Sequence, residues 1–187
     1  IFLTIKLPEI YSSDKYKFQW IPYLGCFLIK KAVLYIGHSI IETIYGETLY
    51  LLNYDTNQKS SFYKMIGHVE ELYNPKNPDG TYPIGDIRKN IPSIRSKKLY
   101  IPLQFFFMKN RGQALPLIAL QYNQVSIEVE LRPINQLFTI VYNDGIRRST
   151  LNHNENTQSS IFKELFLKNT TDPDYRIQLE CNYIYLG

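Results

Sequence analysis

The chain has 187 residues, of which 44% are hydrophobic and 14% aromatic, and its formal net charge is +4. A chain of this length buries a core of its own, so residues 1–187 are taken as one domain. The modest charge does not predict binding to nucleic acid, and the longest apolar stretch, Ile21–Ile29, is far shorter than the roughly 20 residues that cross a bilayer.

The first predicted element is a strand at the start of the chain, Ile1–Leu7, whose odd-numbered residues are all apolar. Because the chain opens on Ile1 inside this pattern, we expect further sequence upstream. Two more strands are predicted between residues 20 and 44, joined by a turn at Gly37–Ser39 and closed by Gly46.

A helical spacing of apolar residues follows in Glu47–Thr56 and Gln58–Leu72, which predicts one or two short helices with an end at Gly67. The next segment, Asn74–Ser96, holds four prolines and the turn pair Asp79-Gly80. These residues forbid a long regular element, so the segment is predicted to be a loop and, with Asn143–Asp174, to be mobile or dependent on a partner.

The second half of the chain returns to strands. Strands are predicted in Lys97–Phe107, before a turn at 110–112, and in Asn135–Arg148, which contains a turn at 143–145. Residues 151–160 are polar and loop-like. The last strand is predicted in Tyr175–Gly187, which places Ile177 and Leu179 on one face together with Cys181 and Tyr183.

The stretch between these strands, Ala114–Pro133, changes its pattern halfway. Leu115–Leu120 is apolar on both faces, which suits a segment covered on both sides or packed into a subunit contact. Val125–Leu131 alternates between apolar and polar residues, which predicts a half-buried strand.

Many strands, long loops and one small helical insertion predict an all-β protein, an antiparallel jelly-roll β-sandwich. We count roughly six or seven strands, whereas a jelly roll closes with about eight. An open sheet edge is therefore expected, and such an edge associates with other chains.

Candidate chemical groups are few. Cys26 and Cys181 lie far apart and predict neither a disulfide framework nor a zinc site. A histidine and a glutamate two residues apart can begin a metal triad of the cupin type, and this spacing occurs at His68/Glu70 and at His153/Glu155. All four lie in polar segments, so no catalytic, cofactor-binding or metal-binding residue is predicted.

Two other features are weighed and set aside. A basic cluster lies in a proline-rich loop without the interleaved aromatic residues of a nucleic-acid platform, and it consists of Arg88, Lys89, Arg95, Lys97 and Lys98. Asn169 begins a formal glycosylation sequon, Asn-Thr-Thr, but nothing in the sequence indicates secretion.

One long segment carries a specific motif. Leu99–Pro133 reads LYIPLQFFFMKNRGQALPLIALQYNQVSIEVELRP. It closely resembles the signature of the major capsid proteins of nucleocytoplasmic large DNA viruses, in which a strand of the type L-x-I/L-P-L-P-F-W-F precedes a glycine turn and A-L-P-L-I-A-L-Q-Y-H-x-V. A second resemblance lies upstream, in Phe18–Leu49. The likeness is strongest to mimivirus-like members and covers nearly the whole chain.

This resemblance implies a double jelly roll assembled as pseudo-hexagonal trimers, of which the chain is similar to the first jelly roll without its leading strands. The implied role is structural, in the icosahedral capsid of a large DNA virus, with no enzyme activity, no cofactor, no transmembrane segment and no direct contact with nucleic acid. The implied partners are copies of the chain in a homotrimer, neighbouring capsomers and minor capsid proteins. The implied location is the virion, after assembly in the host cytoplasm.

The sequence departs from the family pattern in places. Gln104 stands where proline is usual, Asn123 where histidine is common, and His38 where a second glycine is usual. Thr48 and Tyr50 stand where a tryptophan often occurs. These departures leave open whether the chain is a major capsid protein or a diverged minor paralogue.

Two alternatives from other classes stay open. A jelly-roll ligand-binding module predicts exposed aromatic side chains at one loop end. A cupin-like metal enzyme predicts that His68, Glu70 and His153 come within reach of one metal ion. A capsid protein instead predicts wide apolar surfaces that are buried against copies of itself.

Overall fold

The computed structural model describes residues 1–54, 59–142, 144–150, 158, 160–161, 164–165 and 176–183. These residues form three sheets of three strands, and every strand pair is antiparallel. The first sheet has the order β5-β1-β9, from Lys98–Pro102, Phe2–Lys6 and Arg176–Glu180. The second has the order β4-β3-β6, from Ser39–Tyr45, Ile29–Ile36 and Val125–Leu131. The third has the order β2-β7-β8, from Lys17–Trp20, Phe138–Val141 and Arg147–Ser149.

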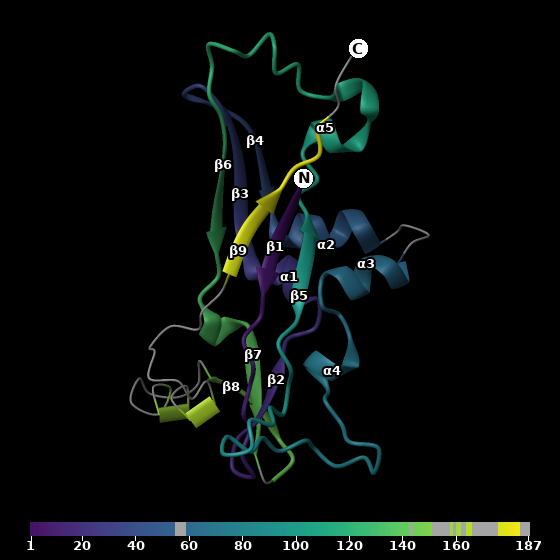
Figure 1. Ribbon diagram of the computed structural model, residues 1–187, viewed down its shortest axis with the longest axis vertical. Coiled ribbons are helices and arrows are strands. Elements are labelled where there is room, and N and C mark those ends of the chain that lie inside the picture. Colours follow the sequence, from purple (N-terminus) through teal and green to yellow (C-terminus); the bar gives the residue numbers. More distant parts are fainter. Residues whose placement is uncertain are drawn as a thin grey trace.

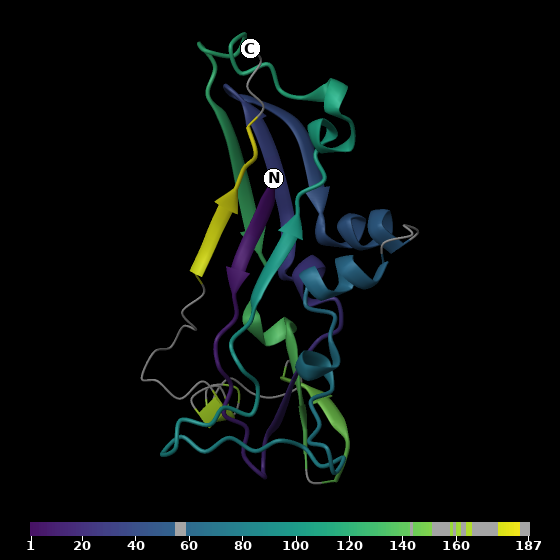
Figure 2. The same cartoon turned by 45° about the vertical axis from the view of Figure 1, so that its right-hand side comes forward.

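The first two sheets face each other in the upper half of the molecule, and the third lies at its lower end (Figures 1 and 2). Leu3 and Ile5 of β1 and Ala32 and Leu34 of β3 are all buried, and they belong to one hydrophobic cluster that also includes Phe18 of β2. A single core therefore runs through all three sheets, as in a β-sandwich. The predicted antiparallel sandwich is confirmed.

Four short helices gather on one flank of the sandwich (Figure 1). They are α1 (Leu24–Leu28), α2 (Gly46–Tyr54), α3 (Lys59–Met65) and α4 (Glu70–Tyr73). The predicted helical insertion is confirmed in α2, α3 and α4, and Gly67, with a φ of +80°, separates α3 from α4 as the sequence indicates. α1 is not predicted, because its residues lie in a segment whose pattern predicts strands. Gly46 allows α2 to start directly against the backbone carbonyls of Cys26 and Ile29.

Short helical turns also lie between β5 and β7. They are α5 (Phe106–Lys109), η1 (Arg111–Gln113) and η2 (Ile134–Gln136). The strand prediction for Lys97–Phe107 is therefore wrong after Pro102. The reason is a tertiary contact, because the Phe106 backbone N–H donates to the Glu42 carboxylate of β4 at 2.7 Å while the Phe105 side chain enters the core.

The strand count also changes. The described residues hold nine strands, two of which, β2 and β8, the sequence patterns do not predict. β2 is missed although Lys17–Trp20 alternates between polar and apolar residues, because four residues are about the shortest run that this pattern can identify. β8 is missed because it has three residues, two of them arginines, and pairs with β7 across a turn at Asp144 and Gly145.

The predicted loop, residues 74–96, is irregular apart from isolated bridges such as Ile10–Ile94 and Asp86–Ile91. Its predicted mobility stays a prediction, and the hydrogen bonds that join Tyr82 and Ser93 to residues 10–18 argue against it. The other segment of that prediction, residues 143–174, lies mostly outside the described residues.

Candidate assembly surface

As far as the described residues show, the sandwich is open along one side, where β6 and β9 are the end strands of the two facing sheets. Within the strand pairings of the described residues, each of them has a single neighbour, β3 and β1 respectively. The outer edge of such a strand carries backbone N–H and C=O groups that another strand can pair with. The sequence also predicts an open edge, but from a count of roughly six or seven strands that the nine described strands overturn.

The residues of β6 that face inward show how far the core extends. Ile127 lies opposite Leu34 of β3 and Val129 lies opposite Ala32, and both partners are fully buried. Ile127 and Val129 pack against the core but are only partly buried themselves. The predicted half-buried strand is confirmed, and its apolar face reaches the open side.

In the facing β5-β1-β9 sheet, apolar residues likewise change from buried in the central strand to exposed in the end strand. Leu179 of β9 pairs with Leu3 of β1, and Ile177 pairs with Ile5. Leu3 and Ile5 are buried, whereas Ile177 and Leu179 are 43% and 44% exposed. The alternation of the last strand correctly predicts which residues share a face, but in the described residues this face is not covered.

The loop above this open side is also apolar. Residues 114–123 form turns rather than a strand, closed by bonds such as Leu120 N–H to the Pro116 carbonyl at 3.2 Å. Leu117 is 48% exposed, Ile118 87% and Tyr122 90%. The prediction that Leu115–Leu120 is covered on both faces is therefore wrong within this chain, and its alternative, a subunit contact, stays a prediction.

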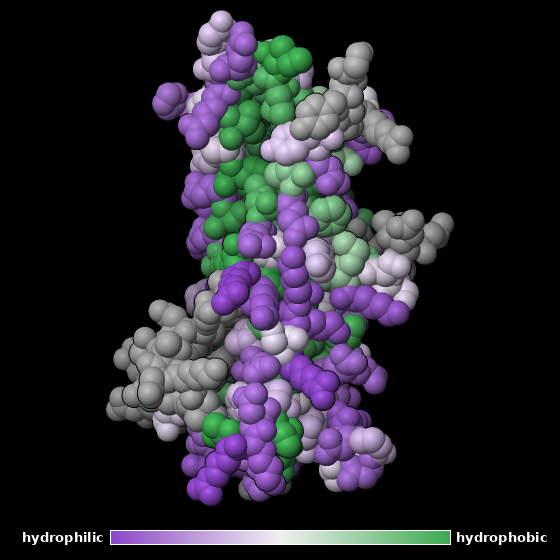
Figure 3. All heavy atoms as spheres, viewed as in Figure 1, coloured by the Kyte–Doolittle hydropathy of each residue, from purple (hydrophilic) through white to green (hydrophobic). Residues whose placement is uncertain are grey.

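Figure 3 shows these features as one continuous surface, a band that descends from the loop into the region between β6 and β9. We call it the apolar band, and it comprises Leu117, Ile118, Val125, Ile127, Val129, Ile177 and Leu179. Contiguous exposed apolar surface of this kind marks an interaction site rather than ordinary solvent-facing surface.

The outer face of the β4-β3-β6 sheet carries charged side chains rather than apolar ones. Glu130 of β6 forms ion pairs with Lys30 at 2.5 Å and Lys31 at 3.4 Å, and Glu128 accepts a hydrogen bond from the Tyr35 hydroxyl at 3.0 Å. The hydrogen bond from Lys30 lowers the pKa of the Glu130 carboxyl, so this group stays charged. The sheet thus has one charged face and one apolar face that the sandwich leaves partly open.

The residues considered for metal binding do not form a metal site in the described part of the chain. The His68 ring is stacked face to face on Tyr23, with centroids 3.9 Å apart, and Glu70 is exposed on α4. Among the described residues no group of three or more His, Cys, Asp or Glu side chains could hold a metal ion. His153, Glu155 and Asn169 lie outside the described residues.

Among the described residues, the two cysteines are free thiols, and most of the basic cluster takes part in ion pairs. Cys26 is buried, which raises the pKa of its thiol to about 12, and Cys181 is partly exposed. Three lysines of the basic cluster are already in ion pairs: Lys89 with Asp86, Lys97 with Glu71 and Lys98 with Glu180. No helix in the described ranges has both the length and the apolar character needed to cross a membrane.

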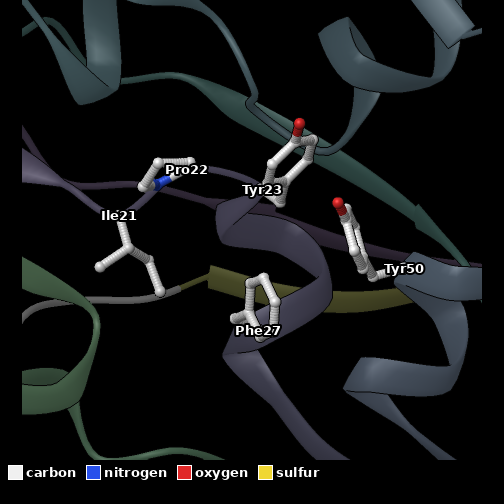
Figure 4. A pocket seen from close by; sticks show the side chains of 5 residues that line it. All are labelled: Ile21, Pro22, Tyr23, Phe27 and Tyr50. Atoms are coloured by element: carbon white, nitrogen blue, oxygen red, sulfur yellow. The ribbon is translucent and has the colours of Figure 1, made fainter. Parts of the chain in front are cut away.

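A shallow aromatic hollow lies on the helical flank and was not anticipated from the sequence. It has a volume of about 450 Å³ and is lined by Ile21, Pro22, Tyr23, Phe27 and Tyr50. Figure 4 shows the Tyr23 and Tyr50 hydroxyls on the same side, away from Phe27. The sequence signals only a general abundance of tyrosine, because the contributing residues come from α1, α2 and the segment before α1 and follow no common period.

Fold and surface together define the class: an antiparallel jelly-roll building block with an apolar side suited to burial in a larger body. Comparison with known families then identifies the chain. The family described as "Major capsid protein N-terminus" matches residues 1–187, and the chain belongs to this family. The resemblance seen in the sequence motifs is confirmed.

Individual relatives agree. Capsid protein 1 of Acanthamoeba polyphaga mimivirus is 35% identical over 147 residues, which make up 74% of this chain and 24% of that protein. The major capsid protein of Phaeocystis pouchetii virus is 33% identical over 159 residues, 77% of this chain and 31% of that protein. The chain thus spans about a quarter to a third of the length of these relatives.

A solved structure supports the fold. A chain of the structure entitled "PBCV-1 virus capsid, quasi-atomic model" superposes with a TM-score of 0.51 at 23% identity, covering 78% of this chain and 31% of that chain. At this identity the likeness concerns the fold alone, and it agrees with the jelly-roll sandwich derived above.

Proposed function

We propose that this chain is the first jelly roll of a structural protein of a large icosahedral DNA virus, and that its apolar band is buried when copies of the protein assemble. Membership of the capsid family supports a structural rather than an enzymatic role. The observation that carries the proposal is the apolar band, in which core-facing residues such as Ile177 and loop residues such as Ile118 are left uncovered.

The assembled form proposed is a homotrimer with a pseudo-hexagonal outline, which contacts neighbouring capsomers and minor capsid proteins in the virion. In a ring of three, one contact is used three times, so a modest gain per copy is multiplied. Covering one isoleucine contributes about 1.5–3 kcal/mol. The gain is smaller for band residues that are already half-buried, so the apolar band favours association by the sum of these partial gains, against the freedom that the copies lose on binding.

The substitution Ile118→Asp in the full-length protein tests this proposal. Ile118 is 87% exposed, so the change should leave the fold of one chain intact, while a charge placed in a buried contact should abolish the trimer. Native mass spectrometry gives the oligomeric state, and electron microscopy of the particles shows whether capsomers form.

The matched control is Ile146→Asp, which introduces the same charge at a 54% exposed isoleucine in the β7–β8 turn, at the opposite end of the molecule. It should assemble like the wild type. Trimers of normal stability from Ile118→Asp would contradict the proposed contact. So would a lowered melting temperature of the single chain without any change in association, because the loop would then be covered within one chain.

A further inference from the structure

A stack of aromatic rings with His68 at its centre joins three segments of the helical flank. Tyr23, the residue before α1, covers one face of the imidazole at a centroid distance of 3.9 Å and an interplanar angle of 14°. Tyr73 of α4 covers the other face at 4.8 Å and 13°, and Tyr63 of α3 meets the ring edge at 5.1 Å and 84°. One histidine thus contacts α3, α4 and the residue that precedes α1 (the arrangement of these helices is seen in Figure 1).

The backbone around His68 holds the ring in place. The His68 N–H donates to the Tyr63 carbonyl at 2.7 Å, and Gly67 packs on the buried side chain of Leu99. Tyr23 starts α1 with a φ of 56°, an uncommon value for a residue with a side chain. The stack therefore depends on several fixed backbone positions rather than on mobile side chains.

The environment of the imidazole suits its neutral form. Its Nδ1 atom is buried and has no hydrogen-bond partner among the described residues, and no ion pair there joins His68 to a carboxylate. Burial lowers the pKa of His68, and burial raises the pKa of Tyr23 to about 12, so Tyr23 stays uncharged. A proton on Nδ1 would add an N–H donor and a charge without a partner.

The charged groups near the stack do not offset such a charge. Glu70 and Glu71 of α4 are exposed, and Glu71 is paired with Lys97 beside β5. Lys64 of α3 is exposed, and the Arg147 guanidinium of β8 donates to the Tyr73 carbonyl at 3.0 Å. The cations on these elements disfavour a positive charge on the His68 ring.

We propose that His68 forms a pH-sensitive contact, which we call the His68 fastening. The neutral imidazole holds α3 and α4 against the start of α1, and its protonation in mild acid loosens these two helices locally. The core residues Phe62, Ile66 and Leu72 keep both helices attached, so the change is a local opening rather than unfolding of the domain. This inference does not depend on the proposed capsid role, because it concerns contacts within one chain.

Hydrogen exchange followed by mass spectrometry on the full-length protein tests the proposal at pH 5 and pH 7.5, with rates corrected for the intrinsic effect of pH. We expect amides of residues 59–73 to exchange several-fold faster at pH 5 than at pH 7.5, and those of β3 to stay unchanged. His68→Phe keeps an aromatic ring that cannot take up a proton, and it should remove this pH dependence.

The control is His38→Gln, which changes an exposed histidine in the β3–β4 turn and should behave like the wild type. Equal exchange at both pH values in the wild type, or a pH effect that persists in His68→Phe, would overturn the proposal. If His68→Phe does not fold, an NMR titration of the wild-type histidines decides instead. A His68 pKa at or above the ordinary value of about 6.5 then refutes the fastening.

Discussion

Replacing Tyr82 by phenylalanine tests whether the long proline-rich loop is fastened to the sandwich. The Tyr82 hydroxyl donates to the Phe18 carbonyl of β2 and lies 3.2 Å from Ser12 Oγ, which accepts the Phe18 N–H at 3.2 Å. At the far end of the loop, Ser93 Oγ accepts the Ser12 N–H and donates to the Ile10 carbonyl, both at 2.9 Å. The loop is thus hydrogen-bonded to β2 and to the segment before it, at Tyr82, at Ser93 and also through the Gly85 N–H, which donates to the Ser12 carbonyl at 2.8 Å.

The substitution keeps the ring and removes only the hydroxyl. Burial raises the pKa of Tyr82, so the hydroxyl remains a donor across the pH range in which the protein is studied. A net contribution of about 0.5–1.5 kcal/mol for each hydrogen bond gives an expected loss of about 1–2 kcal/mol. In a domain of this size that lowers the melting temperature by about 2–8 °C.

Thermal unfolding of the full-length protein measures this loss, and hydrogen exchange locates it. We expect faster exchange in residues 74–96 of Tyr82→Phe and little change in β3. The control is Tyr122→Phe, which removes a hydroxyl from a side chain that is 90% exposed and should have no effect. Identical melting of the two variants would refute the fastening, and so would a wild-type loop that proteases cut first at Tyr82.

Two further predictions concern single side chains. Gly67→Ala should lower the free energy of unfolding more than Gly80→Ala does, although φ is similar at the two sites, +80° and +83°. The reason is that a Cβ added at Gly67 would lie 2.7 Å from the Leu99 side chain, whereas a Cβ added at Gly80 would meet no atom within 4 Å. The shared backbone strain is about 1–2 kcal/mol, and chemical denaturation with equal losses would contradict the argument. Alkylation at pH 8 should label Cys181 in the native protein and Cys26 only after unfolding, because Cys26 is buried and burial raises the pKa of its thiol to about 12. Peptide mass spectrometry identifies the labelled cysteine. Rapid labelling of Cys26 in the native protein would show that α1 opens readily.

The local spacing of apolar and polar residues predicts much of this fold. The alternation of β6 predicts its strand and its inward face, and the turn at Gly37 with its positive φ predicts the β3–β4 hairpin. The helical spacing before Gly67 predicts the insertion. These features depend on neighbours a few residues apart, so the order of the residues is enough to predict them.

Contacts between distant segments decide the rest. Phe106 lies outside the strand because its N–H donates to Glu42 of another sheet. His68 is the centre of a stack because α3, α4 and the residue before α1 place tyrosines against it. The alternation of β9 identifies an apolar face but not whether anything covers it. Burial depends on which segments lie opposite each other, and β9 pairs with β1 from the other end of the chain, so only the assembled sheets show that Ile177 and Leu179 extend the core to an open side.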